Sequence, residues 1–202
     1  MMTVGRFATK FHVSTIAVLV LTSAWSSRAM AQDDHSHTIS AGYHNPTPQE
    51  KKQQNALVQE VRRVTAQFQR NPPADRGLVF GCVSGGDFGA MGMHFLKGSV
   101  LNDGEVKIDD PEIFLYEPLP NGKLQLTGVD YLVFKSDWEA IPEHKGVQPS
   151  LMGQLFHLFD APNRFGLDPF YTLHVWAWKD NPNGTFTNWN PNVSCDAFAG
   201  EK

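Results

Sequence analysis

The spacing of apolar residues changes near residue 78. Between residues 47 and 70, apolar residues recur every three or four positions, which places them on one face of a helix. Residues 47–50 read Thr-Pro-Gln-Glu, a capping box with proline at the first helical position, and Asn71-Pro72-Pro73 ends the pattern. The sequence therefore predicts an amphipathic helix over residues 47–70 that packs against another element through a single apolar face. The residues of this face are Leu57, Val61, Val64 and Phe68.

From residue 78 onward the pattern becomes that of strands, with short apolar runs separated by glycine, proline and asparagine. Asn121-Gly122 indicates a tight turn between two of the runs, and Gly128 indicates a bulge. With one helix, about six strands and no second helical pattern, we expect an α+β fold. It is mainly antiparallel β, as a curled sheet, sandwich or barrel-like structure, with the N-terminal helix packed on it. The runs are 78–83, 93–98, 112–117, 124–134, 151–159 and 170–178.

Residues 1–31 are typical of a signal peptide. Arg6 and Lys10 precede a short apolar run at 13–24, and Ala29-Met30-Ala31 provides the small residues that signal peptidase requires. The run is shorter than the roughly 20 residues that span a bilayer. We expect cleavage after Ala31 and export to the periplasm or the medium, with no membrane insertion once the signal is removed.

The mature chain divides into a polar tail and one domain. Residues 32–45 carry three histidines and predict a disordered, solvated tail, for which metal scavenging is the alternative. Residues 46–198 predict a single globular domain whose β-rich region covers 78–195. The net charge of −4 and the lack of a basic run argue against a nucleic-acid partner. The three histidines are His35, His37 and His44.

The chain has two cysteines, Cys82 and Cys195. In an oxidising compartment two cysteines usually pair, and a bridge over so long a loop stabilises the fold by about 4 kcal/mol. The alternative is two unpaired buried thiols. A redox site is disfavoured because the sequence contains no C-x-x-C.

Three histidines lie within apolar strands, where an imidazole needs a hydrogen-bond partner or a metal ion. His94, His157 and His174 each have apolar neighbours, and Glu117 ends the run EIFLYE on its apolar face. Three histidines and one glutamate are the ligand set of cupin-type barrels, although the cupin spacing is absent. The set predicts a divalent transition metal: Zn, Cu, Mn, Fe or Ni. The alternative is three independent core histidines.

A second hypothesis is a non-catalytic module whose pocket accepts an apolar or aromatic small molecule. Its predicted lining residues are Met93, Tyr116, Thr172 and Trp176, with further methionines at Met91 and Met152. A structural protein of the envelope is the third hypothesis, and whether the chain is an enzyme stays open.

Familiar catalytic and ion-binding motifs are disfavoured. The glycine-rich segment 85–92 lacks the lysine and helix of a phosphate loop. Gly81-Cys82-Val83-Ser84-Gly85 lacks the glycine two residues before the serine that a nucleophile elbow requires, and no spacing supports a triad of Ser84, Asp130 and His174. The segment 180–188 has oxygen donors but lacks the distal glutamate of a calcium loop.

Several blocks of the chain together resemble a group of exported bacterial proteins. They are GCVSGGDFGAMGMHF, EIFLYEP, GVDYLVF, LMGQLFH and LHVWAWKDNPNGTFTNWNPNVSC, and they cover nearly all of residues 78–195. The resemblance implies an exported domain. It carries no catalytic residue to this chain, because the group has no assigned activity.

Overall fold

The computed structural model describes residues 46–200, and the predicted signal peptide and polar tail lie outside this range. Its first element is the helix α1, Pro48–Thr65, followed by a 3₁₀ turn, Ala66–Phe68. The predicted capping box is present, since Glu50 N–H donates to Thr47 Oγ1 at 3.2 Å and Thr47 N–H donates to the Glu50 carboxylate at 2.7 Å. The local sequence therefore determines where this helix begins.

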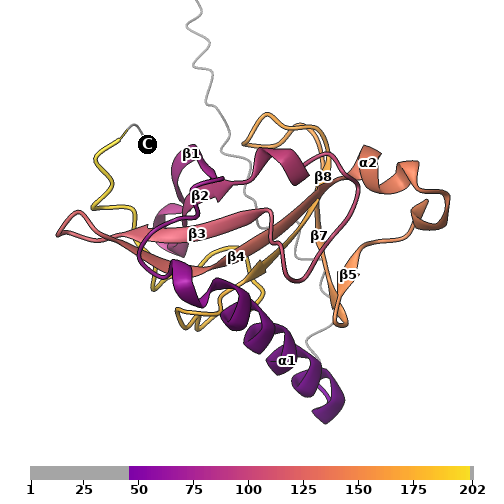
Figure 1. Cartoon of the computed structure of the whole chain (residues 1–202), viewed down its shortest axis with the longest axis horizontal. Coiled ribbons are helices and arrows are strands. Elements are labelled where there is room, and N and C mark those ends of the chain that lie inside the picture. The colour runs from indigo at the N-terminus through magenta and orange to yellow at the C-terminus, as the bar shows by residue number, and fades with distance from the viewer. Residues whose placement is uncertain (1–45, 201–202) are drawn as a thin grey trace, which may run out of the picture. The chain divides into compact units, whose positions relative to one another are not determined.

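A six-stranded antiparallel sheet follows, in the order β1-β2-β3-β4-β8-β7. A separate two-stranded ribbon, β5-β6, stands outside it. The predicted α+β, mainly antiparallel fold with one long N-terminal helix is confirmed within residues 46–200 (Figure 1). The strands of the sheet are β1 (Gly77–Ser84), β2 (Ala90–Leu96), β3 (Ile113–Pro118), β4 (Leu124–Phe134), β7 (His157–Phe159) and β8 (Phe170–Val175).

The sheet separates two apolar clusters. Alternation along β4 and β8 sends one set of side chains toward α1, and Leu57 and Val61 of the helix are fully buried against them. We call this side the helix face. The other set points to the opposite side, the inner face, where it joins apolar residues of β1, β2 and β3. The strand residues of the helix face are Val129, Tyr131, Val133, Tyr171, Leu173 and Val175.

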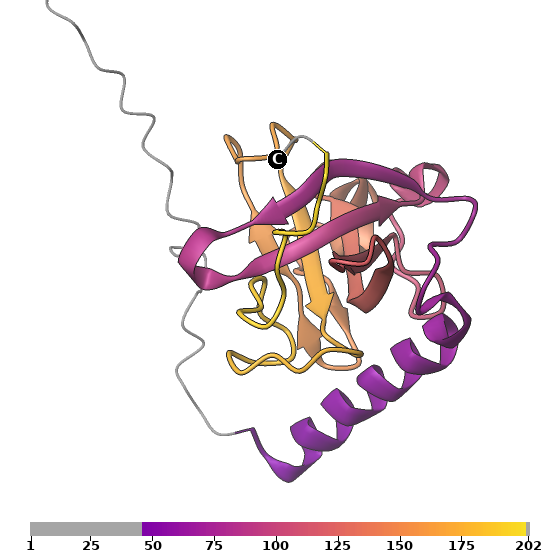
Figure 2. The ribbon, with the colours of Figure 1, turned by 90° about the vertical axis from the view of Figure 1, so that its left-hand side faces the viewer.

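The sheet is strongly curled toward its inner face. Two devices in the sequence permit this: β1 bulges between Val79 and Cys82, and β4 bulges at the predicted position, Gly128. A Cβ on Gly128 would lie 2.3 Å from the carbonyl oxygen of Val175, so this close approach of β4 and β8 requires glycine. In Figure 2 the β1–β2 hairpin runs steeply across the direction of β8, as expected of a curled sheet.

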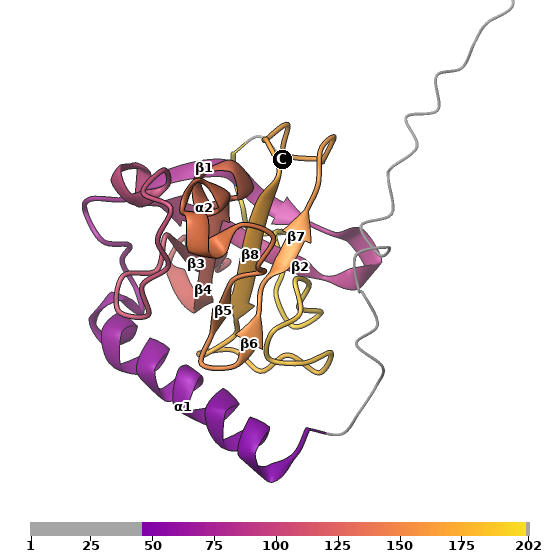
Figure 3. The ribbon, with the colours of Figure 1, turned by 90° about the vertical axis from the view of Figure 1, so that its right-hand side faces the viewer.

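The predicted strand over residues 151–159 is wrong. Met152 and Gly153 both have positive φ, 48° and 81°, and they form a turn between β5, Ser150–Leu151, and β6, Gln154–Leu155. Only β7 then joins the sheet, beside β8 (Figure 3). The expected absence of a second helix is also wrong, since β4 continues into the short helix α2, Lys135–Ala140. The last predicted strand ends at Val175 rather than at residue 178.

The predicted disulfide is present. Cys82 of β1 is bonded to Cys195 in the C-terminal segment, and both cysteines are buried in the inner-face cluster. The bond thus anchors a long irregular segment to the sheet. Among residues 46–200, no helix is both long and apolar enough to cross a bilayer.

Candidate metal centre

The register of the sheet places an acid opposite a histidine. Asp130 of β4 pairs directly with His174 of β8, so the two side chains share the inner face. Asp130 Oδ1 lies 3.5 Å from His174 Nδ1, an ion-pair distance that is too long for a good hydrogen bond. Both residues are buried, with exposed fractions of 3% and 2%.

The curl of the sheet adds a second histidine. His94 lies on β2, three strands from β8, which in a flat sheet would separate the two backbones by about 14 Å. The ring centroids of His94 and His174 are nevertheless only 6.5 Å apart. One donor atom from each of His94, Asp130 and His174 lies within 4.8 Å of the others. We call these three residues the His94–Asp130–His174 group.

Neighbouring residues fix two members of the group. His94 Nδ1 lies 3.0 Å from the carbonyl oxygen of Gly92, which can only accept, so Nδ1 carries the proton and Nε2 keeps a free lone pair. The hydroxyl of Thr172 donates to Asp130 Oδ1, and the backbone of Leu173 also bonds to this carboxylate. Such contacts orient an imidazole and a carboxylate in the way that the outer contacts of metal sites do.

The third member lacks any hydrogen bond. Both ring nitrogens of His174 are buried and neither has a hydrogen-bond partner. A neutral imidazole always carries one N–H, so a buried donor and a buried acceptor are left unsatisfied, at a cost of about 1–3 kcal/mol each. Coordination of a metal ion by His174, with a water on the other nitrogen, would remove this cost.

Burial sets the protonation of the group. Desolvation lowers the pKa of His94 to about 4, and the backbone carbonyl of Gly92 opposes this shift. Desolvation, together with His94 and His157, also lowers the pKa of His174 well below its usual value. Both imidazoles are therefore neutral at pH 7, which is the form that binds metals. Desolvation raises the pKa of Asp130 to about 7, against the hydrogen bond from Thr172.

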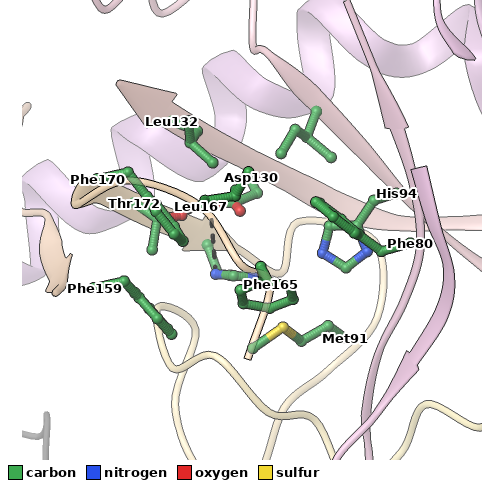
Figure 4. Close-up of a pocket in the computed structure, with 12 residues that line it drawn as sticks. Phe80, Met91, His94, Asp130, Leu132, Phe159, Phe165, Leu167, Phe170 and Thr172 are labelled. Carbon is green, nitrogen blue, oxygen red and sulfur yellow. Dashed lines mark hydrogen bonds and ion pairs between the residues drawn. The ribbon is translucent and has the colours of Figure 1, made fainter. Parts of the chain in front are cut away.

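The group opens onto a cavity of about 30 Å³ on the inner face. Phe165 and Leu167, from the loop between β7 and β8, cover it together with Phe80 of β1 (Figure 4). The other apolar lining residues are Met91, Ile113, Leu132, Phe159 and Phe170. His94 and Asp130 point into this hollow in Figure 4, where the dashed line marks the 3.5 Å approach of Asp130 Oδ1 to His174 Nδ1.

Two of the residues predicted as metal ligands lie outside the group. His157 of β7 is half-buried and bonds to the backbone of Phe186, although it pairs in register with Thr172. Glu117 is 7% exposed, its Oε1 accepts from Ser194 N–H at 3.0 Å and its Oε2 pairs with Lys179. The Glu117 carboxylate thus joins β3 to the C-terminal segment.

Of the four residues predicted to line a ligand pocket, Thr172 lines the cavity. Met93 and Tyr116 are buried in the inner-face cluster, and the Tyr116 hydroxyl donates to the carbonyl oxygen of Phe68 at 2.5 Å. Trp176 donates through Nε1 to the carbonyl oxygen of Thr187 at 2.6 Å. Met91 also lines the cavity, whereas Met152 is at the exposed turn between β5 and β6.

The carboxylate of the group, Asp130, was missed as a ligand by the sequence reasoning. It stands in GVDYLVF, as the only charged residue of an eleven-residue strand. Like Glu117, Asp130 is an acid on an apolar strand face, and this feature of the sequence could have identified it as a candidate ligand. Its position opposite His174 follows only from the pairing of β4 with β8 in the structure.

Comparison of the chain with protein-family models, with curated proteins and with solved structures finds no match.

Proposed function

We propose that this protein is an exported metal-binding protein whose mononuclear centre is formed by His94, Asp130 and His174. The observation that carries the proposal is the buried His174 imidazole, whose two nitrogens lack hydrogen bonds beside a carboxylate and a second imidazole. Two histidines and one carboxylate are the ligands of many mononuclear iron and zinc sites.

The spacing of the donors supports an ion of this size. Zinc and similar ions bind imidazole and carboxylate at about 2.0–2.2 Å, so two donors of a tetrahedral site lie about 3.3–3.6 Å apart. The three donors lie within 4.8 Å of one another. The side chains would therefore have to draw together by up to about 1.5 Å to share one ion.

Export is the second part of the proposal. It is supported by the predicted signal peptide and by the Cys82–Cys195 disulfide, because such bonds persist in oxidising compartments. A periplasmic or secreted location is consistent with both features.

The alternative of a module for apolar or aromatic ligands has less support. Pockets for such molecules usually enclose a few hundred Å³, far more than the roughly 30 Å³ on the inner face. We therefore favour the metal centre.

Metal analysis of the purified chain beginning at Gln32 tests the proposal. His35, His37 and His44 are first replaced by alanine, so that the tail contributes no metal. We expect one equivalent of a divalent ion after loading with zinc or cobalt and removal of the excess. His174→Ala and Asp130→Ala should each reduce this to a small fraction.

Two further histidines provide the controls. His144 stacks on Trp138, outside the group, so His144→Ala should keep the full equivalent. His157→Ala should also keep it, which distinguishes the three-residue centre from a set that includes His157. Retention of metal by His174→Ala would overturn the proposal.

A further inference from the structure

The proposed metal centre has room for at least one ligand that the protein does not supply. The group supplies three protein donors, and ions of the zinc and iron type take at least four ligands. The strands β2, β4 and β8 that carry these donors close one side of the centre, and the cavity lies on the other. Any further ligand must therefore fit within the cavity.

The cavity favours a small ligand. The space open to the centre of a water molecule is about 30 Å³, and apolar side chains surround it. A compact ligand of a few heavy atoms therefore fits this space better than a planar ring such as imidazole.

The walls offer such a ligand no hydrogen bonds. Outside the three group members, Thr172 is the only polar lining residue, and its hydroxyl is engaged with Asp130. Four phenylalanines make up much of the remaining surface, so a polar organic molecule would lose its hydration without compensation. The phenylalanines are Phe80, Phe159, Phe165 and Phe170.

The charge of the centre selects the sign of the ligand. A divalent ion with one carboxylate, Asp130, keeps one net positive charge among apolar walls, and no lysine or arginine lines the cavity. Glu112 does not line the cavity, and its carboxylate accepts from the N–H of Leu132 at 3.1 Å. A single negative charge on the ligand would neutralise the site.

We propose that the vacant position binds a small monoanion of one to three heavy atoms, of the hydroxide, cyanide or azide class. This inference rests on the proposed metal function and adds the chemical class of its ligand.

Access to the site lies between two aromatic rings. Phe80 is 49% exposed and has φ of 57°, a left-handed conformation that is costly for phenylalanine and that sets its ring at the mouth of the cavity. The ring of Phe165 lies 5.3 Å from it, centroid to centroid. The side chain of Asn163 holds the backbone of this loop, accepting from the N–H of Phe165 at 3.1 Å. Figure 4 shows both rings at the front of the hollow.

The test uses the chain from Gln32, with the three tail histidines replaced, loaded with Co²⁺ and titrated with azide while the visible absorption spectrum is recorded. We expect a saturable spectral change with azide, and at least a tenfold weaker response to imidazole. Phe165→Ala enlarges the cavity and should admit imidazole. Phe88→Ala, a change at an exposed phenylalanine that does not line the cavity, should behave as the wild type does.

The outcomes separate this inference from the metal function. Absence of a Co²⁺ spectrum before any azide is added means that the metal proposal itself fails. A Co²⁺ spectrum that azide leaves unchanged, or that imidazole changes as readily as azide, overturns the ligand proposal alone. Circular dichroism confirms the fold of Phe165→Ala, and Leu167→Ala provides a second opening of the same wall.

Discussion

The two faces of the sheet use the same strands for different purposes. On the helix face two buried hydroxyls are paired: that of Tyr131 donates to the carbonyl oxygen of Ile108 at 2.8 Å, and that of Thr65 donates to the carbonyl oxygen of Val61 at 2.6 Å. On the inner face, one residue along from Tyr131, Asp130 meets a histidine whose two nitrogens have no hydrogen bond. Natural interiors rarely leave such groups unsatisfied. The helix face therefore serves stability, and the inner face carries the proposed metal centre.

The largest loss of stability should come from removing the disulfide of the inner face. Replacing Cys82 and Cys195 by serine frees a loop of 113 residues, and the loop-entropy model predicts that the free energy of unfolding falls by about 4–5 kcal/mol. Urea denaturation of the wild type and the double variant measures this difference. A loss below 1 kcal/mol would show that the C-terminal segment is held by its non-covalent contacts.

A cavity on the helix face should reduce stability without changing the metal content. Leu57 is fully buried between α1 and the sheet, so Leu57→Ala should lower the free energy of unfolding by about 2–5 kcal/mol. The metal content of the folded protein should stay at one equivalent. Loss of metal from folded Leu57→Ala would show that the two faces are coupled.

On the inner face we expect a substitution that raises stability but abolishes metal binding. His174→Leu replaces an unsatisfied imidazole with an apolar side chain, so the metal-free protein should gain about 1–3 kcal/mol while metal binding is lost. Chemical denaturation in the presence of a chelator measures the gain. A metal-free variant less stable than the wild type would mean that His174 already has good partners.

The smallest effect concerns His157, at the edge of the inner face. Burial lowers the pKa of this imidazole below its usual value of about 6.5, so the unfolded chain binds a proton more readily than the folded one, and wild-type stability is lost as the pH falls below that value. His157→Gln removes this titrating group. The melting temperature of the metal-free variant should rise relative to that of the wild type between pH 7 and 5, whereas a constant difference would exclude the assigned shift.

Features that depend on neighbouring residues in the chain could be predicted from the sequence. The start of α1 follows from Thr47, Pro48 and Glu50, and the bulge follows from Gly128. The disulfide followed from the cysteine count and the expected compartment. The turn at Met152-Gly153 was missed because the apolar run around it suggested a continuous strand, and methionine rarely adopts positive φ.

The composition of the site could be predicted only in part, because it depends on the curl. Alternation along β8 places His174 on the inner face, but only the three-dimensional path of the sheet brings β2 near enough for His94 to approach it. Glu117 and Asp130 are both acids in apolar strands. What distinguishes them is Lys179, which follows β8 and pairs with Glu117, a contact between residues 62 positions apart.

The most direct test of the metal centre is anomalous diffraction from crystals of the cobalt- or zinc-loaded protein, recorded at the absorption edge of the metal. We expect one anomalous peak on the inner face, about 2.0–2.2 Å from a ring nitrogen of His94, a ring nitrogen of His174 and an oxygen of Asp130. A loaded crystal with no peak among these three residues, and with His174 hydrogen-bonded to water alone, would contradict the account.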